Sequence, residues 1–276
     1  MPAKKKSDPG FVEIMTVDTG RVDFCVLGTM PLIHNRPSQK VLQGLLCPAP
    51  KKTAVEKRNS FKHDPLEEYR ESPYKSRNTK SPTLIEHLSS AFKCAMKSAA
   101  LDLPGVTKAA IGRSVWVEGE RVAIYGVPEM SMMVVRSADM NRTPDVRTRA
   151  IMPEWACRIT VSYVRPQLTE QAVCNLLAAA GLTRGIGDGR NEKGWGTFGQ
   201  FELVEEKDPR YVHLMKHAGR KAQKAALAEP GFYDDETEAL YQWFLEEVER
   251  RKTIQPLKPK KAPKAKSKTN GASAEA

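Results

Sequence analysis

The sequence predicts an α+β fold in which two helices cover one sheet. Apolar residues recur at helical spacing in residues 83–102 and 168–181. They alternate with polar residues in 113–118, 154–164 and 197–206, as in half-buried strands. With an alternating segment before the first helix, the order is strand, helix, strands, strand, helix, strand. This is the β-α-β-β-α-β pattern of a ferredoxin-like (RRM-like) domain with insertions.

The domain is expected to span residues 11–207. Residues 11–27 contain two alternating segments around a turn at 18–20. Residues 36–82 are polar, rich in Lys, Arg, Pro and Ser, and lack a sustained apolar period, which predicts a long, partly mobile insertion. Residues 83–102 then predict a helix whose apolar face is formed by Ile85, Leu88, Phe92, Ala95 and Ala99.

The second half of the domain contains the strongest local patterns. Four segments predict strands, namely 113–118, 121–127, 130–136 and 154–164, and residues 119–150 form a hairpin region. Thr169 is an expected helix N-cap and Gly181 the expected stop, so 168–181 predicts a helix of about three turns.

Two C-terminal helices are expected in residues 208–252. Asp208 before Pro209 is a favourable start for the first. The second begins with acidic residues and ends with basic ones, as the helix dipole favours. Its expected buried residues are Leu240, Trp243, Phe244 and Val248.

The basic charge lies mostly at the two ends of the chain. Of the net charge of +11, residues 1–10 carry +2 and residues 251–276 carry +7, which leaves +2 for the body. We expect basic disordered tails at 1–10 and 253–276. The C-terminal tail is either a solubilising end or a nonspecific anion-binding arm.

Several classes of protein are disfavoured. The five cysteines are odd in number and never in C-x-x-C spacing, which favours a reducing cytoplasm over a disulfide framework or a zinc site. No segment resembles a signal peptide or a membrane span. No metal-ligand or nucleophile motif is visible, so neither a cofactor nor a metal is expected.

A glycine-rich segment, GIGDGRNEKGWGTFGQFE, follows the second helix. It is not a dinucleotide fingerprint, since Arg190 stands where a third glycine is needed, and it is not a Walker A loop, since Gly194 follows Lys193. A nucleic-acid backbone could be held by glycine N–H groups and two cations, with an aromatic ring for stacking. The expected contacts are Gly185, Gly187, Gly189, Arg190, Lys193, Gly194, Trp195, Gly196 and Phe198. Alternatively, the glycines only permit a tight helix-to-strand crossing while Trp195 and Phe198 fill the core.

The spacing G-I-G, six residues, G-W-G resembles the glycine-rich loop of the RAMP superfamily, the RNA-binding subunits of CRISPR effector complexes. The segment TMPLIHNRPS, the AFK helix and the W-x-x-x-I-x-V-x-Y strand are also similar to a related group of bacteriophage and mobile-element proteins. The resemblance covers roughly residues 11–204. It implies binding of single-stranded RNA or DNA and assembly of copies side by side along the strand, as a homo-oligomer or filament in the cytoplasm of a bacterial host, with no membrane partner.

Two further segments are candidate contacts. His34 and Arg36 lie in a turn that could hold a phosphate, and Arg142, Arg147 and Arg149 lie where a hairpin tip could reach along a strand. The first segment could equally be an ordinary surface turn, and for the second a solvated charged loop is the usual outcome. Some RAMP-like proteins cleave RNA with a histidine, and His34 is the one weak catalytic candidate.

Three hypotheses remain open from the sequence. The leading one is a noncatalytic single-strand binder that oligomerises. The second is a metal-independent endoribonuclease of the same fold. The third is an assembly or interaction protein that does not bind nucleic acid, which the modest charge of the body favours.

Overall fold

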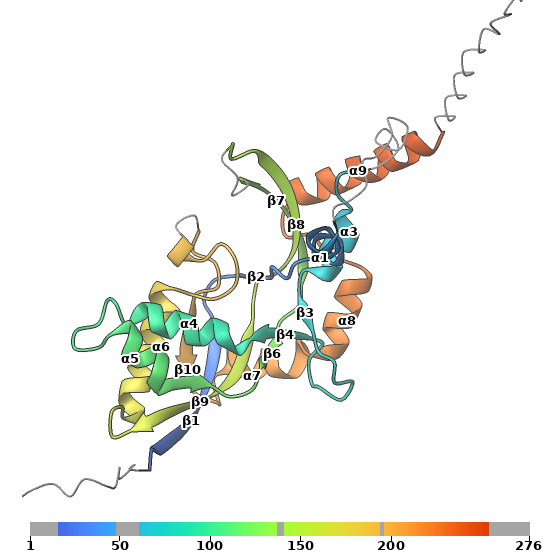
Figure 1. The fold of residues 1–276 in the computed structure, drawn as a ribbon. Coiled ribbons are helices and arrows are strands. Elements are labelled where there is room, and N and C mark those ends of the chain that lie inside the picture. The colour runs from blue at the N-terminus through green and yellow to red at the C-terminus, as the bar shows by residue number, and fades with distance from the viewer. Residues whose placement is uncertain (1–15, 48–60, 137–140, 194–195, 254–276) are drawn as a thin grey trace, which may run out of the picture.

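A computed structural model describes residues 16–47, 61–136, 141–193 and 196–253 (Figure 1). The fold is α+β, with a curled antiparallel sheet as its centre. The expected tails, at 1–10 and 253–276, lie outside the described residues except for Thr253, where the last helix ends; Gly194 and Trp195 also lie outside.

The larger sheet contains seven of the described strands. Their order is β10 (Phe201–Val204), β1 (Asp18–Gly28), β9 (Ala156–Arg165), β6 (Arg121–Tyr125), β4 (Ile85–Leu88) and β3 (Tyr74–Lys75), and β5 (Val115–Val117) pairs with β9 as well. All of these pairings are antiparallel. The longest runs between β1 and β9, where Phe24 lies opposite Ile159.

Strand β1 separates two apolar clusters because its side chains alternate between the faces of the sheet. Phe24 and Val26 belong to the main core, together with residues of α4 (Ser89–Ala99) and α6 (Glu170–Thr183). Leu27 belongs to a smaller cluster with Tyr211 and Leu214 of α7 (Pro209–His217). The sheet is therefore covered on both faces. Helix α5 (Lys108–Ser114) lies next to α4.

A second, three-stranded sheet projects from the first. It consists of β2 (Leu32–Ile33), β8 (Pro144–Met152) and β7 (Glu129–Arg136), paired antiparallel in that order. The β7–β8 hairpin extends away from the larger sheet, with α9 (Asp235–Thr253) beside it (Figure 1).

The segment predicted as a helix from residue 83 begins as a strand instead. Ile85–Leu88 forms β4, whose Ile85 and His87 are buried while Glu86 and Leu88 are half-buried, and helix begins only at Ser89. Ile85 and Leu88 are spaced as on one face of a helix, and the second buried residue of the strand is the polar His87, so the sequence pattern favoured a helix. Pairing of β4 with β3 and β6 favours the strand.

The expected insertion at 36–82 also contains regular structure. Helix α1 (Gln39–Leu46) begins at an N-cap formed by Ser38, and α3 (Pro65–Glu71) begins at an N-cap formed by Asp64. Residues 48–60 between them lie outside the described part of the chain.

Three helices, rather than two, occupy the C-terminal region. The Asp208 cap starts α7 as expected, accepting hydrogen bonds from two main-chain N–H groups. Helix α8 (Arg220–Ala228) follows after a break at Gly219, and α9 is the third. The expectation that Leu240 and Trp243 are buried is wrong, since both are exposed. Within the described residues, no helix combines the length and apolar character needed to cross a bilayer.

Candidate nucleic-acid interface

Three segments that the sequence selected separately come together at β2. Strand β2 pairs with β8 on one side, where Ile33 lies opposite Ile151. On its other side, the main-chain N–H of Asp188, in the glycine-rich loop, donates to the carbonyl of Ile33 at 3.1 Å. Arg149 of β8 forms an ion pair with Asp188. The turn after β2, the base of the hairpin and the glycine-rich loop therefore form one continuous region.

A basic pocket of about 530 Å³ lies on this region, between β8, α1 and α3. Asn35, Ser38, Glu68 and Thr148 contribute polar atoms to its wall. Its basic lining residues are Arg36, Lys40, Lys62, Arg147 and Arg149. We call these five side chains and the space they enclose the basic pocket. It includes three of the predicted contacts, Arg36, Arg147 and Arg149.

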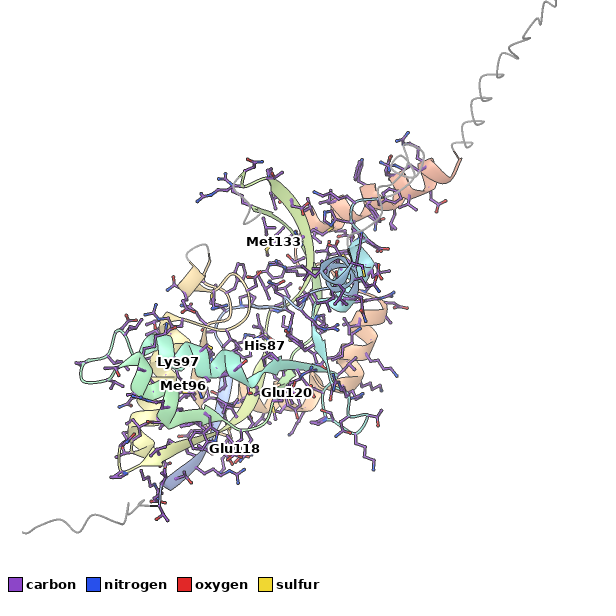
Figure 2. The ribbon with its side chains drawn as sticks, viewed as in Figure 1. His87, Met96, Lys97, Glu118, Glu120 and Met133 are labelled. Carbon is purple, nitrogen blue, oxygen red and sulfur yellow. The ribbon has the colours of Figure 1, made fainter. Side chains whose placement is uncertain are left out.

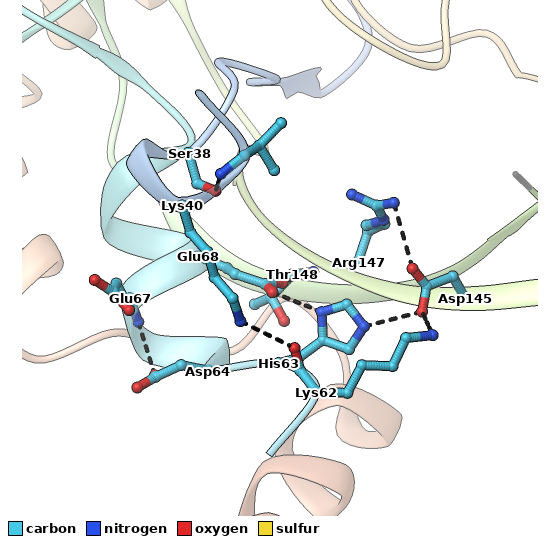
Figure 3. A network of polar contacts seen from close by, with 11 residues as sticks. Ser38, Lys40, Lys62, His63, Asp64, Glu67, Glu68, Asp145, Arg147 and Thr148 are labelled. Carbon is cyan, nitrogen blue, oxygen red and sulfur yellow. Dashed lines mark hydrogen bonds and ion pairs between the residues drawn. The ribbon is translucent and has the colours of Figure 1, made fainter. Parts of the chain in front are cut away.

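A histidine-centred network forms one wall of the basic pocket (Figure 3). The Nδ1 atom of His63 lies 2.6 Å from the Glu68 carboxylate, and its Nε2 atom lies 2.9 Å from Asp145. Asp145 also accepts from Lys62 at 2.5 Å and pairs with Arg147 at 3.3 Å. Since a neutral imidazole has only one N–H, both carboxylates receive a hydrogen bond only when His63 is protonated.

Burial and neighbouring charges shift the pKa values of two residues beside the pocket, Asp145 and Arg149. Burial alone would raise the pKa of Asp145, but hydrogen bonds from Lys62 and His63 hold it below its usual value. Burial lowers the pKa of Arg149, although Asp188 opposes that shift. The Arg149–Asp188 ion pair holds β8 against the glycine-rich loop. The contact of Asp145 with His63 holds β8 against the segment just before α3.

Two other cations of the basic pocket lack carboxylate partners among the described residues, although Lys40 donates a hydrogen bond to the main-chain carbonyl of Lys62 at 3.3 Å. Within the described residues, Arg36 and Lys40 form no ion pair with a carboxylate. The hydroxyl of Thr148 and the Nε atom of Arg147 are buried without a hydrogen-bond partner in the described part of the chain. Buried polar atoms are normally satisfied, so the pocket offers both free positive charge and unused hydrogen-bonding capacity to an anion.

Arg142 lies apart from the basic pocket. It is exposed, close to the turn of the β7–β8 hairpin, and has a positive φ of 46°. Arg142 lies near the turn of the hairpin, whereas the pocket lies toward its base, so one extended ligand could contact both.

The glycine-rich loop is folded tightly on itself and on β2. Gly185, Gly187, Gly189 and Gly199 all have positive φ. A Cβ atom on Gly187 would lie 2.6 Å from the Leu32 side chain and 2.7 Å from the carbonyl of Ile33. The glycines are thus required by close backbone approach as well as by conformation.

Many of the loop's N–H groups are already used. Those of Gly185, Ile186, Asp188, Phe198 and Gly199 donate to main-chain carbonyls. An anion bound here would have to use the remaining N–H groups. The loop therefore makes the tight helix-to-strand crossing that was the alternative role considered for its glycines.

The charged and aromatic residues of the loop differ in what they contact. Arg190 donates to the carbonyl of Gly187 at 2.8 Å and to Glu192 at 3.1 Å, and Glu192 also accepts from Ser98 of α4 at 2.6 Å. Phe198 is half-buried, and a Cβ on Gly196 would lie 3.0 Å from its ring. The Lys193 side chain, Gly194 and Trp195 lie outside the described part of the chain.

His34 is not part of the open site. It is fully buried, and its ring packs edge-on against His87 with 5.8 Å between ring centroids. Figure 2 shows His87 in the middle of the molecule, where the two sheets meet. Burial, and then the charge of the neighbouring His87, lowers the pKa of His34 to about 3. His34 thus has no contact with solvent in this conformation.

No sequence pattern singled out Lys40, Lys62, His63 or Thr148. The first three lie in the polar segment 36–82, where no periodicity marked them. Thr148 lies within the hairpin segment but carries no charge. Only their approach to Arg147 and Arg149 distinguishes them from other surface residues.

Comparisons with known proteins give remote likenesses. No family model and no curated sequence matches this chain. One similar solved structure is a chain of a type III-B Cmr-β complex bound to cognate target RNA. It is 15% identical to this chain, with a TM-score of 0.37. The match covers 68% of this chain but only 59% of the Cmr-β chain. Another is a chain of a CRISPR RNA-guided surveillance complex, 12% identical with a TM-score of 0.29 over 85% of each chain. Neither likeness is close enough to assign a fold or a function.

Proposed function

We propose that this protein binds single-stranded nucleic acid, RNA or DNA, without cleaving it, and that copies assemble along the bound strand. The observation that supports binding is the basic pocket. Among the described residues, neither Arg36 nor Lys40 of this pocket pairs with a carboxylate, and the hydroxyl of Thr148 has no hydrogen-bond partner. A phosphodiester has the charge and the acceptor oxygens that such groups bind.

The surroundings of the basic pocket suit a chain-like ligand. The pocket is open to solvent along the base of the hairpin, and the half-buried Phe198 belongs to the adjoining loop. Phosphate contacts that fix a backbone, together with an aromatic ring on which a base can stack, are the usual means of binding a single strand without sequence preference.

Within this proposal, the core is a ferredoxin-like domain related to the RAMP superfamily. The strand order β10-β1-β9-β5, antiparallel throughout, supports it. Helix α4 comes after β1 and an insertion that contains β2, α1, α3, β3 and β4, and α6 connects β9 to β10; without the insertion this order is compatible with β-α-β-β-α-β. The resemblance of the loop to RAMP and phage proteins leads us to propose a phage or mobile-element origin and a place in the bacterial cytoplasm.

Binding can be tested by fluorescence polarisation with labelled 20-nucleotide RNA and DNA of mixed sequence. Arg36→Ala and Lys40→Ala should each weaken binding about fivefold, roughly 1 kcal/mol, for every sequence, because a phosphate contact carries no base information. Each should also reduce the slope of log K against log salt by about 1.

Lys108→Ala is the matched control, since Lys108 is an exposed lysine on α5 outside the basic pocket. It should bind like the wild type. The proposal is wrong if the wild type binds neither RNA nor DNA, or if the pocket variants and the control lose affinity equally.

Absence of cleavage can be tested with the same RNA. Incubation with the full chain in EDTA, and separately with Mg²⁺ or Zn²⁺, should leave the RNA intact, because the described residues hold no cluster of three or more metal-ligating side chains. Cleavage in EDTA would instead favour the metal-independent endoribonuclease.

A further inference from the structure

The histidine-centred network beside the basic pocket changes its net charge with the protonation of His63 (Figure 3). It consists of two carboxylates, Glu68 and Asp145, and three groups that can carry positive charge, Lys62, His63 and Arg147. When His63 is protonated, three cations face two carboxylates and one positive charge is in surplus. When His63 is neutral, the charges of the network cancel. The proton on His63 therefore determines whether this wall attracts an anion.

Asp145 links His63 to two cations that line the pocket. Its Oδ1 atom lies 2.5 Å from the Lys62 ammonium and 2.9 Å from Nε2 of His63, and its Oδ2 atom lies 3.3 Å from Arg147. The Asp145 side chain is only 14% exposed, and a carboxylate so far out of water needs a cation beside it. Protonated His63 supplies that cation from within the wall, so Lys62 and Arg147 can turn toward a ligand. When His63 is neutral, Asp145 retains both.

The ring of His63 is held in place from its other side. Its Nδ1 atom lies 2.6 Å from Oε1 of Glu68, whose Oε2 atom accepts from the main-chain N–H of Thr148 at 3.3 Å. The ring thus meets a carboxylate at each nitrogen and gains or loses a proton without having to turn. Among the described residues, the charged groups around it are Lys62, Glu68, Asp145, Arg147 and, through the carbonyl of Lys62, Lys40.

The other four histidines are placed differently. Burial holds the pKa of His34 at about 3 and that of His87 at about 4, so both stay neutral near pH 7. His213 and His217 are exposed on α7 and do not line the basic pocket. His63 does line it. Since histidine is the side chain that ordinarily changes charge near neutral pH, His63 is the group through which pH can act on this pocket.

We propose that His63 makes nucleic-acid binding at the basic pocket depend on pH, with tighter binding when its ring is protonated. The inference rests on the proposed function and adds a regulation of that same site. A phosphate beside Lys62 and Arg147 is stabilised by the surplus positive charge, and by linkage a bound strand stabilises the protonated ring. His63 is a positioning residue, because it acts through Asp145 on the two pocket cations.

Fluorescence polarisation tests the inference with the full chain and a labelled single strand, RNA or DNA, whichever binds more tightly. Between about pH 6.5 and about pH 8.5, at constant ionic strength, wild-type affinity should fall about fivefold, the effect of one partly screened charge near a phosphate. His63→Gln stays neutral, so it should bind weakly at both ends of the range and lose most of the pH dependence. His63→Lys stays charged and should bind at about pH 8.5 nearly as tightly as the wild type does at about pH 6.5.

His213→Gln/His217→Gln is the matched control, since it removes two exposed histidines outside the pocket. It should retain the wild-type pH dependence. The inference is overturned, with the proposed binding left intact, if wild-type affinity does not change with pH or if His63→Gln keeps the wild-type dependence. It is also overturned if His63→Lys binds as weakly as His63→Gln, because the residue would then act by shape rather than charge. A wild type that binds neither RNA nor DNA would refute the proposed function, and this inference with it.

Imidazole NMR of the full chain, labelled with ¹⁵N-histidine, gives a readout that does not depend on measured affinity. Adding the same strand should raise the pH at which His63 loses its second N–H, because the coupling between proton and ligand is reciprocal. His213 and His217 should titrate at nearly the same pH with and without the strand. A bound strand that leaves the titration of His63 unchanged would contradict the inference.

Discussion

At the scale of single residues, the buried histidine pair makes stability depend on pH. Burial lowers the pKa of His34 to about 3, and burial followed by the charge of Arg190 lowers that of His87 to about 4. In the unfolded chain both titrate near pH 6.5. Because the folded pKa values are depressed, the unfolded state takes up protons first as pH falls.

Stability should therefore decrease from about pH 6.5 downward, by about 2 kcal/mol per histidine at pH 5. Melting temperatures at pH 7.5 and 5 measure the loss. The double variant His34→Leu/His87→Leu should lose less on acidification than the wild type, whereas His217→Gln, at an exposed histidine, should retain the full wild-type loss. An unchanged loss in the double variant would contradict this assignment.

Gln223 shows how one buried polar side chain can join distant segments. It is fully buried, accepts from the N–H groups of Leu84 and Ile85, and donates to the carbonyls of Ile124 and Gly126 at 2.7 and 3.1 Å. It thus connects α8 to both β4 and β6.

Gln223→Leu should cost roughly 3–5 kcal/mol of unfolding free energy, because it leaves several buried main-chain groups without partners. Urea denaturation measures it. Gln171→Leu, at an exposed glutamine bonded only to Asn175 of its own helix, should change stability by about 0.5 kcal/mol or less. Similar losses in both variants would show that the network has little effect.

At the scale of elements, the backbone of the glycine-rich loop requires glycine at Gly187, whereas helix α1 does not require it at Gly44. Gly187 has a φ of +81° and no room for a Cβ, whereas a Cβ on Gly44 of α1 would meet nothing within 4 Å. Gly187→Ala should lower stability by roughly 2 kcal/mol or more through left-handed strain and contact with Ile33.

Gly44→Ala should instead raise it by roughly 0.5–1 kcal/mol, because alanine favours helix. Thermal melts of the two variants give the comparison. If Gly187→Ala is as stable as the wild type, the loop is more deformable than its packing on β2 indicates.

At the scale of the whole molecule, charge is distributed unevenly, with the C-terminal tail much more basic than the body. Removing residues 254–276 deletes six lysines and one glutamate. Affinity for nucleic acid should fall and its salt dependence should flatten, because fewer counterions are released, while any preference between strands stays the same. Polarisation across a salt series measures both. A truncated chain that binds nothing would show that the folded part is not the binding module.

The sequence by itself determined those helix ends and strands that depend only on residues close to one another along the chain. Thr169 caps α6 and Asp208 caps α7 as expected, and Ile159, Val161 and Tyr163 of β9 are buried as their alternation predicts, although Ser162 between them is buried as well. Caps, glycine conformations and strand alternation depend on neighbours within about four residues, and a sequence pattern records those directly. Local pattern also selected Arg36, Arg147 and Arg149 as candidate contacts.

The tertiary structure alone decided which elements meet. Residues 85–88 are a strand because β3 and β6 pair with them, although their spacing also suits a helix. His63 reaches Asp145 across 82 positions of sequence, and Arg149 reaches Asp188 across 39. The basic pocket exists only through such pairings, and no periodicity encodes it, because it depends on partners that lie far apart along the chain.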